Sequence, residues 1–128
     1  MLKIDDPDIV REVTEASDCY EVALMANDLT QLDALFRDAP ETIRYGVGEN
    51  LYGFEEIAEF RKTRTGGSPR RKVLRRVVTT YGHGMATVNL EFRREGSTRT
   101  GRQSQTWLRT DEGWRIATAH VSLMESFS

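Results

Sequence analysis

The sequence predicts an α+β fold in which a curved, mainly antiparallel sheet wraps round a long N-terminal helix to form a cone-shaped barrel. In the first part of the chain, apolar residues recur at three- and four-residue steps, which is typical of amphipathic helices. From residue 71 onward the period changes to two, and long segments alternate with short turns rich in glycine. Helices followed by a run of strands indicate an α+β domain with the helices on one face of the sheet.

The helical part is expected to contain three helices. Asp6 and Pro7 suit the start of a long helix that ends near Asn27. A second, short helix follows, and a third is expected over residues 54–65. Between the second and third helices, residues 42–52 have the pattern of a short strand, a turn and a short return strand.

The strand part is expected to be a meander of four strands, over residues 71–81, 85–93, 99–110 and 114–123. If Asp111-Glu112 is a two-residue loop, Thr110 lies opposite Gly113 and sets the register of the last hairpin. In that register the face made apolar by its tryptophans consists of Gln103, Gln105, Trp107, Trp114, Ile116, Thr118 and His120. The hollow under this face is expected to have a closed apolar bottom and an open mouth, which suits a ligand.

Length and composition indicate a single domain over residues 1–128. The sequence contains no run of about 18 apolar residues, and no apolar signal core follows its first residues. The one cysteine, Cys19, cannot form an internal disulfide. We therefore expect a cytoplasmic protein that does not bind a membrane.

Charge is divided unevenly along the chain. Residues 1–60 hold 15 acidic and 4 basic side chains, whereas residues 61–128 hold 5 acidic and 14 basic ones. This asymmetry favours acidic helices lying against a basic sheet over a nucleic-acid partner, because the pattern of an aromatic, basic RNA-binding surface is missing. We expect instead that some of the arginines bind a small anionic substrate.

Two residues stand out as candidates for chemistry. Tyr20 lies on the apolar stripe of the first helix, where its phenol either fills space or donates a proton into the hollow. Arg44 is expected to point away from Ile43 and Tyr45, and a buried arginine needs an acid such as Glu49 or a ligand carboxylate. By contrast, the arginines of the third helix, Arg61 and Arg64, are expected on a solvated face.

Metal and cofactor sites are not expected. The two histidines, His83 and His120, lie in different elements and do not form a set of zinc ligands. Gly46 and Gly48 join two short extended pieces and do not open a helix after a strand, as a phosphate-binding loop would. His120 is either a core histidine or a ligand-binding one, and Gln103 and Gln105 either face solvent or contact the ligand.

Several segments together resemble the AtzH-like subfamily of the SnoaL-like, or nuclear transport factor 2-like, superfamily, which has a cystatin-like fold. The resemblance covers residues 6–124. It rests on Arg44-Tyr45-Gly46, Glu49-Asn50-Leu51-Tyr52-Gly53, Phe60-Arg61-x-x-Arg64, Gly101-Arg102-Gln103-Ser104-Gln105-Thr106-Trp107, and the closing run from Gly113 to Ser122.

This resemblance implies a homodimer packed through the sheet and a role beside an amidase in cyanuric acid or ureide catabolism. It implies a cofactor-free lyase that decarboxylates 1,3-dicarboxyurea, with Tyr20 and Arg44 as the catalytic pair. A carbamate-type acid loses CO2 once its nitrogen is protonated, so Arg44 would hold the carboxylate and Tyr20 would deliver the proton. We expect the substrate-binding residues to be Gln103, Gln105, His120, Trp107 and Tyr45.

Two other classes of function remain open. The protein could be a non-catalytic binding or accessory module for the neighbouring amidase, which its uneven charge would suit. It could also be a SnoaL-like isomerase or dehydratase, which places a carboxylate or a His-Asp base in the hollow. Asn89 and Glu91 are expected on the face opposite His120, which disfavours this second alternative.

Overall fold

The computed structural model describes residues 1–126 and shows an α+β fold, as predicted. The helices are α1 (Pro7–Ala26), α2 (Leu29–Leu35) and α3 (Phe54–Thr63). The strands are β1 (Ile43–Tyr45), β2 (Asn50–Tyr52), β3 (Arg71–Tyr81), β4 (Met85–Arg94), β5 (Thr100–Thr110) and β6 (Gly113–Leu123). They form one six-stranded sheet in the order β2-β1-β6-β5-β4-β3.

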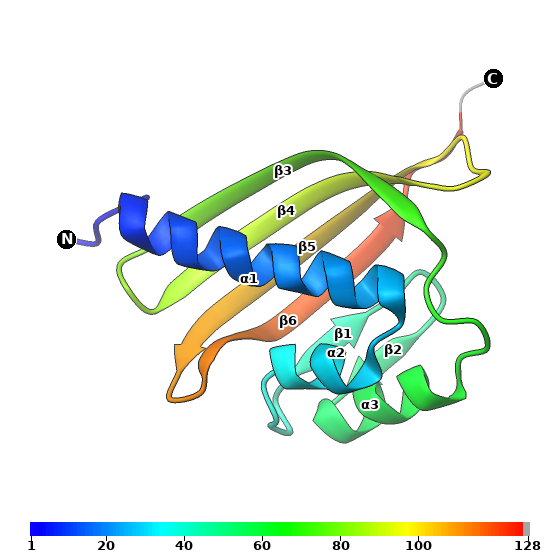
Figure 1. The fold of residues 1–128 in the computed structure, drawn as a ribbon, viewed down its shortest axis with the longest axis horizontal. Coiled ribbons are helices and arrows are strands. Elements are labelled where there is room, and N and C mark those ends of the chain that lie inside the picture. The colour runs from blue at the N-terminus through cyan, green and yellow to red at the C-terminus, as the bar shows by residue number, and fades with distance from the viewer. Residues whose placement is uncertain (127–128) are drawn as a thin grey trace.

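The sheet is curved and open rather than a closed barrel, because β2 and β3 are its two edges. The pairs along β3, β4, β5 and β6 are antiparallel, as is the pair β1–β2, whereas β1 runs parallel to β6. Figure 1 shows α1 lying across one face of the sheet, with α2, α3 and the β1–β2 hairpin grouped at one end. This end of the molecule carries the candidate site.

The long helix α1 begins and ends as the sequence predicts. The Asp6 side chain accepts a hydrogen bond from the backbone N–H of Asp8 at 3.0 Å, and Pro7 is the first helical residue. Asn27 ends the helix in the left-handed conformation, with φ of 50°. Although α1 is long, no helix within residues 1–126 is both long and apolar enough to cross a membrane.

The core lies between the helices and the concave face of the sheet. Trp107, Phe36 and Ile116 are among its largest fully buried side chains, and α1 contributes a stripe that includes Val13 and Tyr20. These residues belong to one continuous apolar cluster. This apolar cluster fills the space between the helices and the sheet.

Ion pairs join the acidic helix α1 to the basic sheet, as the charge pattern predicts. Asp18 contacts Arg76 at 2.6 Å, Glu21 pairs with Arg71, and Glu12 pairs with Arg109. The uneven charge of the two halves of the sequence is therefore used, at least in part, for packing one half against the other.

The predicted orientation of His120 is wrong, because a β-bulge interrupts the last hairpin. Thr110 pairs with Gly113 and Trp107 with Ile116 as expected, but the register then shifts by one, leaving Ala117 as the extra residue. One inserted residue exchanges the two faces of a strand beyond it. His120 consequently pairs with Ser104 on the exposed face.

The same shift corrects one expectation and leaves another intact. His120 shares the exposed face with Asn89, which is also a partner of Ser104, instead of lying opposite it. Gln103 and Gln105 keep their predicted inward orientation, since they precede the bulge and are 1% and 2% exposed. The two glutamines of β5 therefore face the helices, whereas His120 faces away from them.

Candidate active site

The β1–β2 hairpin directs Arg44 toward the helices. Arg44 pairs with Ala119 of β6 and Leu51 of β2, which are both buried, so its side chain lies on the covered face of the sheet. Arg44 Nη1 donates to Glu49 Oε1 at 2.9 Å, and the Arg44 side chain is 13% exposed. Glu49 is thus the acidic partner that the sequence indicates for this arginine.

The turn of this hairpin is shaped to hold Glu49 in place. Glu49 Oε2 accepts a hydrogen bond from the backbone N–H of Gly48 at 3.2 Å. A Cβ atom on Gly46 would lie 1.7 Å from Glu49 Oε1, so only glycine allows the carboxylate to fold back over the turn. Gly46 therefore leaves room for the Arg44–Glu49 ion pair, and the backbone of Gly48 helps to hold it.

Tyr20 and Arg44 line the same cavity. Tyr20 is 2% exposed and reaches this cavity from the buried stripe of α1. The remaining lining residues are Leu24, Ile57, Phe60, Arg61 and Arg64. The free volume is about 10 Å³, which is roughly the room that one water molecule needs. The side chains around the phenol and guanidinium therefore close tightly on one another.

A chain of hydrogen bonds orients the Tyr20 hydroxyl. Arg71 Nη2 donates to Gln103 Oε1 at 2.7 Å, and Gln103 Nε2 donates to Tyr20 Oη at 3.3 Å. Glu21 in turn holds the guanidinium of Arg71. Because arginine can only donate, the amide oxygen of Gln103 must face it and the amide nitrogen must face the phenol. Tyr20 Oη accepts this bond and keeps its own proton for donation elsewhere.

Arg61 lies in a buried place and not on the solvated face that the sequence suggested. It is 5% exposed, donates to Asp33 Oδ1 at 2.9 Å, and lies 4.4 Å above the Phe36 ring. Burial lowers its pKa, which Tyr20 and Asp33 partly offset. The sequence spacing could have indicated this position. Ile57, Arg61 and Arg64 are four and three residues apart, so they lie on one face of the helix.

Arg64 is half-buried and also lines the cavity. Its guanidinium carbon lies 5.5 Å from the centre of the Phe60 ring, and that of Arg44 lies 5.8 Å from the same centre. Burial lowers the pKa of Arg64, and the positive charge of Arg44 lowers it further. Its buried Nε atom has no hydrogen-bond partner within residues 1–126.

The other residues expected to bind substrate lie away from this cavity. Trp107 is fully buried in the core, where its Nε1 donates to Gln105 Oε1 at 3.1 Å. Tyr45 and His120 lie on the opposite face of the sheet, with ring centres 5.6 Å apart, and the Tyr45 hydroxyl is 3.2 Å from that of Tyr52. The structure therefore brings together Tyr20, Arg44 and Gln103.

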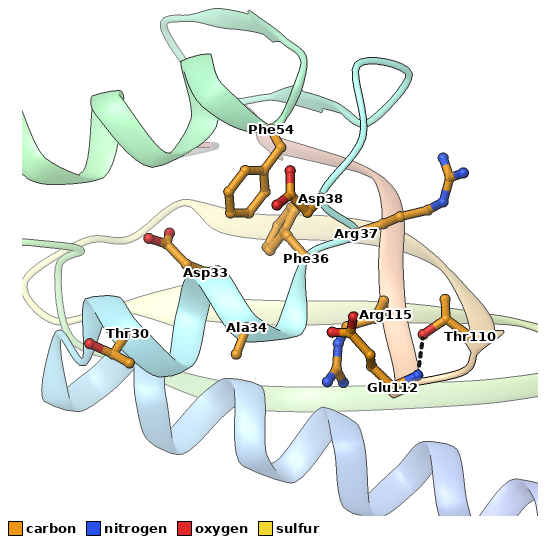
Figure 2. Close-up of a pocket in the computed structure, with 10 residues that line it drawn as sticks. All are labelled: Thr30, Asp33, Ala34, Phe36, Arg37, Asp38, Phe54, Thr110, Glu112 and Arg115. Carbon is orange, nitrogen blue, oxygen red and sulfur yellow. Dashed lines mark hydrogen bonds between the residues drawn. The ribbon is translucent and has the colours of Figure 1, made fainter.

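A larger hollow of about 460 Å³ lies between α2, the start of α3 and the β5–β6 turn. Figure 2 shows the rings of Phe36 and Phe54 in its wall beside the carboxylate of Asp38, whereas Arg115 lies near Glu112 and Arg37 extends away from the rings. We place the candidate site in the narrow cavity despite its small volume. The buried Tyr20 hydroxyl, which a hydrogen bond from Gln103 orients, and the guanidinium groups of Arg44, Arg61 and Arg64 converge there. Within residues 1–126, no three His, Cys, Asp or Glu side chains gather to hold a metal ion.

The curved sheet around a long helix, with a polar cavity at one end of its concave face, defines a nuclear transport factor 2-like protein of cystatin-like fold. A Salmonella enterica protein of that superfamily is 27% identical, with a TM-score of 0.77 and 94% of each chain covered. More particularly, the chain belongs to the AtzH-like family, whose sequence model matches residues 2–126.

Two solved structures are more similar. A DUF3225-family protein of unknown function from Pectobacterium atrosepticum is 51% identical, with a TM-score of 0.92 and 95% of each chain covered. A cystatin-like fold protein from Burkholderia xenovorans is 43% identical, with a TM-score of 0.94, covering 99% of this chain and all of its own. No curated protein matches the sequence significantly.

Proposed function

We propose that the protein is a cofactor-free decarboxylase of an N-carboxylated urea, such as 1,3-dicarboxyurea, or of a related ureide acid. The observation that carries this proposal is the convergence of the buried Tyr20 phenol and the Arg44 guanidinium in one cavity. Membership of the AtzH-like family supports it. The chemistry needs one cation to hold a carboxylate and one acid to protonate nitrogen, and these two side chains supply both.

The reaction balances with these groups alone. Arg44 binds the carboxylate on the urea nitrogen, and Tyr20 Oη gives its proton to that nitrogen. The C–N bond then breaks, its electron pair stays on nitrogen, and CO2 leaves. The tyrosinate takes a proton back from water, so each turnover consumes one proton and converts the dicarboxylate to the monocarboxylate. Proton transfer of this kind contributes about 10²–10⁴-fold to a rate.

Groups around Tyr20 stabilise the tyrosinate that this step forms. Gln103 Nε2 already donates to Tyr20 Oη, and Arg61 adds positive charge to the cavity wall. Such preorganised donors act most strongly where water is excluded. Leu24, Ile57 and Phe60 provide that exclusion.

The test is CO2 release from freshly generated 1,3-dicarboxyurea. We expect Tyr20→Phe and Arg44→Met to lower kcat/KM by about 100-fold or more, while melting temperatures show that both variants fold. Tyr45→Phe is the matched control, because that phenol lies on the opposite face of the sheet. Wild-type rates in both cavity variants would refute the assigned roles. Substrate binding without turnover would identify a binding module instead.

A second candidate is acid–base chemistry of the isomerase or dehydratase kind, with Glu49 as the base. It is favoured by the position of the Glu49 carboxylate, 2.9 Å from Arg44 at the edge of the cavity. The pair also disfavours it, since both carboxylate oxygens of Glu49 already accept hydrogen bonds, one from Arg44 and one from the Gly48 N–H. Glu49→Gln discriminates: we expect it to lower decarboxylation only partly, whereas it would abolish a reaction that uses Glu49 as base.

A further inference from the structure

Positive charge exceeds negative charge around the candidate site. Five arginines gather there, namely Arg44, Arg61, Arg64, Arg71 and Arg94. Three of them have a carboxylate partner, in Glu49, Asp33 and Glu21. Within the described residues, the other two make no ion pair, so the site has two positive charges in excess. Buried or half-buried cations are costly unless paired.

Of the two unpaired arginines, Arg64 is the one that lines the cavity. Within residues 1–126 its buried Nε atom has no hydrogen-bond partner, and the guanidinium carbons of Arg44 and Arg64 lie 5.8 Å and 5.5 Å from the centre of the Phe60 ring. An unsatisfied buried donor costs about 1–3 kcal/mol. A carboxylate bound by Arg64 would remove this cost and offset the repulsion that Arg64 experiences from Arg44.

We propose that Arg64 binds a second carboxylate of the substrate and thereby selects doubly charged acids over singly charged ones. This inference rests on the proposed function for the identity of the reacting carboxylate, which Arg44 holds. Arg64 is then a specificity residue, because it contacts the carboxylate that stays on the product.

The narrowness of the cavity fits this role. Its free volume of about 10 Å³ cannot hold a substrate, so a side chain has to move when one binds. Arg44 and Arg61 are fixed by their ion pairs, whereas no carboxylate within residues 1–126 fixes Arg64. Arg64 has a long side chain and lies at the end of α3 as its C-cap residue. Its movement makes room for the substrate and brings its guanidinium to the carboxylate.

Equilibrium binding tests the proposal without any turnover. Isothermal titration calorimetry would compare glutarate, a stable dicarboxylate with three atoms between its carboxyl groups, and butyrate, which lacks one carboxylate. We expect wild-type protein to bind glutarate more tightly, and Arg64→Met to weaken glutarate binding by about 10- to 100-fold while leaving butyrate within about twofold. Arg64→Lys should restore part of the preference. Lys62→Met, which removes an exposed charge from the same helix, should leave it intact.

Kinetics separate this proposal from the proposed function. A carboxylate that stays charged throughout the reaction contributes equally to substrate and transition state, so Arg64→Met should raise KM and change kcat little. If the preference for glutarate depends on Arg64 but no CO2 is released, the proposed decarboxylase activity is overturned and the role of Arg64 stands. The role of Arg64 would be overturned by a different result. In that case turnover would depend on Tyr20 and Arg44, but Arg64→Met would leave both KM and the preference for glutarate unchanged.

Discussion

At the scale of single residues, the site is built from side chains that fix one another. Gln103 joins Arg71 to Tyr20, and its two amide atoms are both occupied by these contacts. The sequence indicated Gln103 as an inward residue that contacts substrate. The structure instead gives it protein partners on both sides, so we assign it the positioning of the Tyr20 hydroxyl.

Gln103→Leu tests this positioning role. Without the amide, Tyr20 Oη loses the donor that stabilises its ionised form, so we expect kcat to fall by about 10-fold while KM changes little. Gln103→Glu, whose carboxyl can still accept from Arg71 but does not donate in its ionised form, should resemble the leucine variant. An unchanged kcat in both variants would contradict the assignment.

Glu12 makes folding stability depend on pH. Hydrogen bonds from Trp114 and from Arg109 lower its pKa below the ordinary value of 4.5. The unfolded chain has the higher pKa, so the stabilisation is fully present above about pH 4.5 and is lost as the pH falls through the lower folded value.

We expect Glu12→Gln to reduce the difference in unfolding free energy between pH 6 and pH 3. The reduction should stay below about 1 kcal/mol, because the ion pair is partly exposed. Urea unfolding at several pH values measures it. Glu15→Gln, at an exposed position on the same helix, is the control and should leave the pH dependence as in wild type.

At the scale of the elements, strand register and one helix face decide where the functional groups lie. The sequence predicted the helices, the strands and the start of the β5–β6 hairpin, because these follow from periodicity and turn residues. It missed the extra residue Ala117, since a bulge has no marker here such as glycine. It also misjudged Arg61, because charge outweighed the i, i+4 spacing from Ile57 that places it inside.

Gly101 of β5 is needed for the packing of the adjacent strand. A Cβ atom there would lie 2.2 Å from Cζ of Phe92, a fully buried ring whose face Arg71 covers at 4.4 Å. We expect Gly101→Ala to lower the unfolding free energy by about 1–3 kcal/mol, as overpacking does. Thermal and urea unfolding measure this change. Gly84→Ala is the control, because nothing lies within 4 Å of its Cβ position.

At the scale of the whole molecule, one face of the sheet is covered by α1 (Figure 1). The other face carries exposed side chains such as Asn89, Ser104 and His120. We propose that this second face is the contact surface of a homodimer. Light scattering should then give twice the chain mass of 14.6 kDa. The family and the architecture could be predicted from the sequence, whereas the assembly depends on a second copy that a single chain does not reveal.

Ser104→Lys tests the dimer surface. Ser104 lies on β5, near the middle of the exposed face, and in a two-fold dimer residues near the axis meet their own copies. Two facing lysines should repel, so we expect the measured mass to fall toward that of one chain. Asp111→Lys, at the tip of the last hairpin, should keep the dimer. The proposed interface would be contradicted if the wild-type protein is a monomer, or if the mass of a dimer is measured for both variants.

The bulge at Ala117 has an effect beyond the hairpin that contains it. Strand β1 pairs with the part of β6 that follows the bulge, and Arg44 lies beside Ala119. Deleting Ala117 would rotate that segment by half a turn, turning Ala119 toward water and His120 toward the protein interior. His120 instead of Ala119 would then be the inward-facing residue of β6 beside Arg44. The extra residue Ala117 thus sets which face of β6 lies beside Arg44, one member of the proposed catalytic pair.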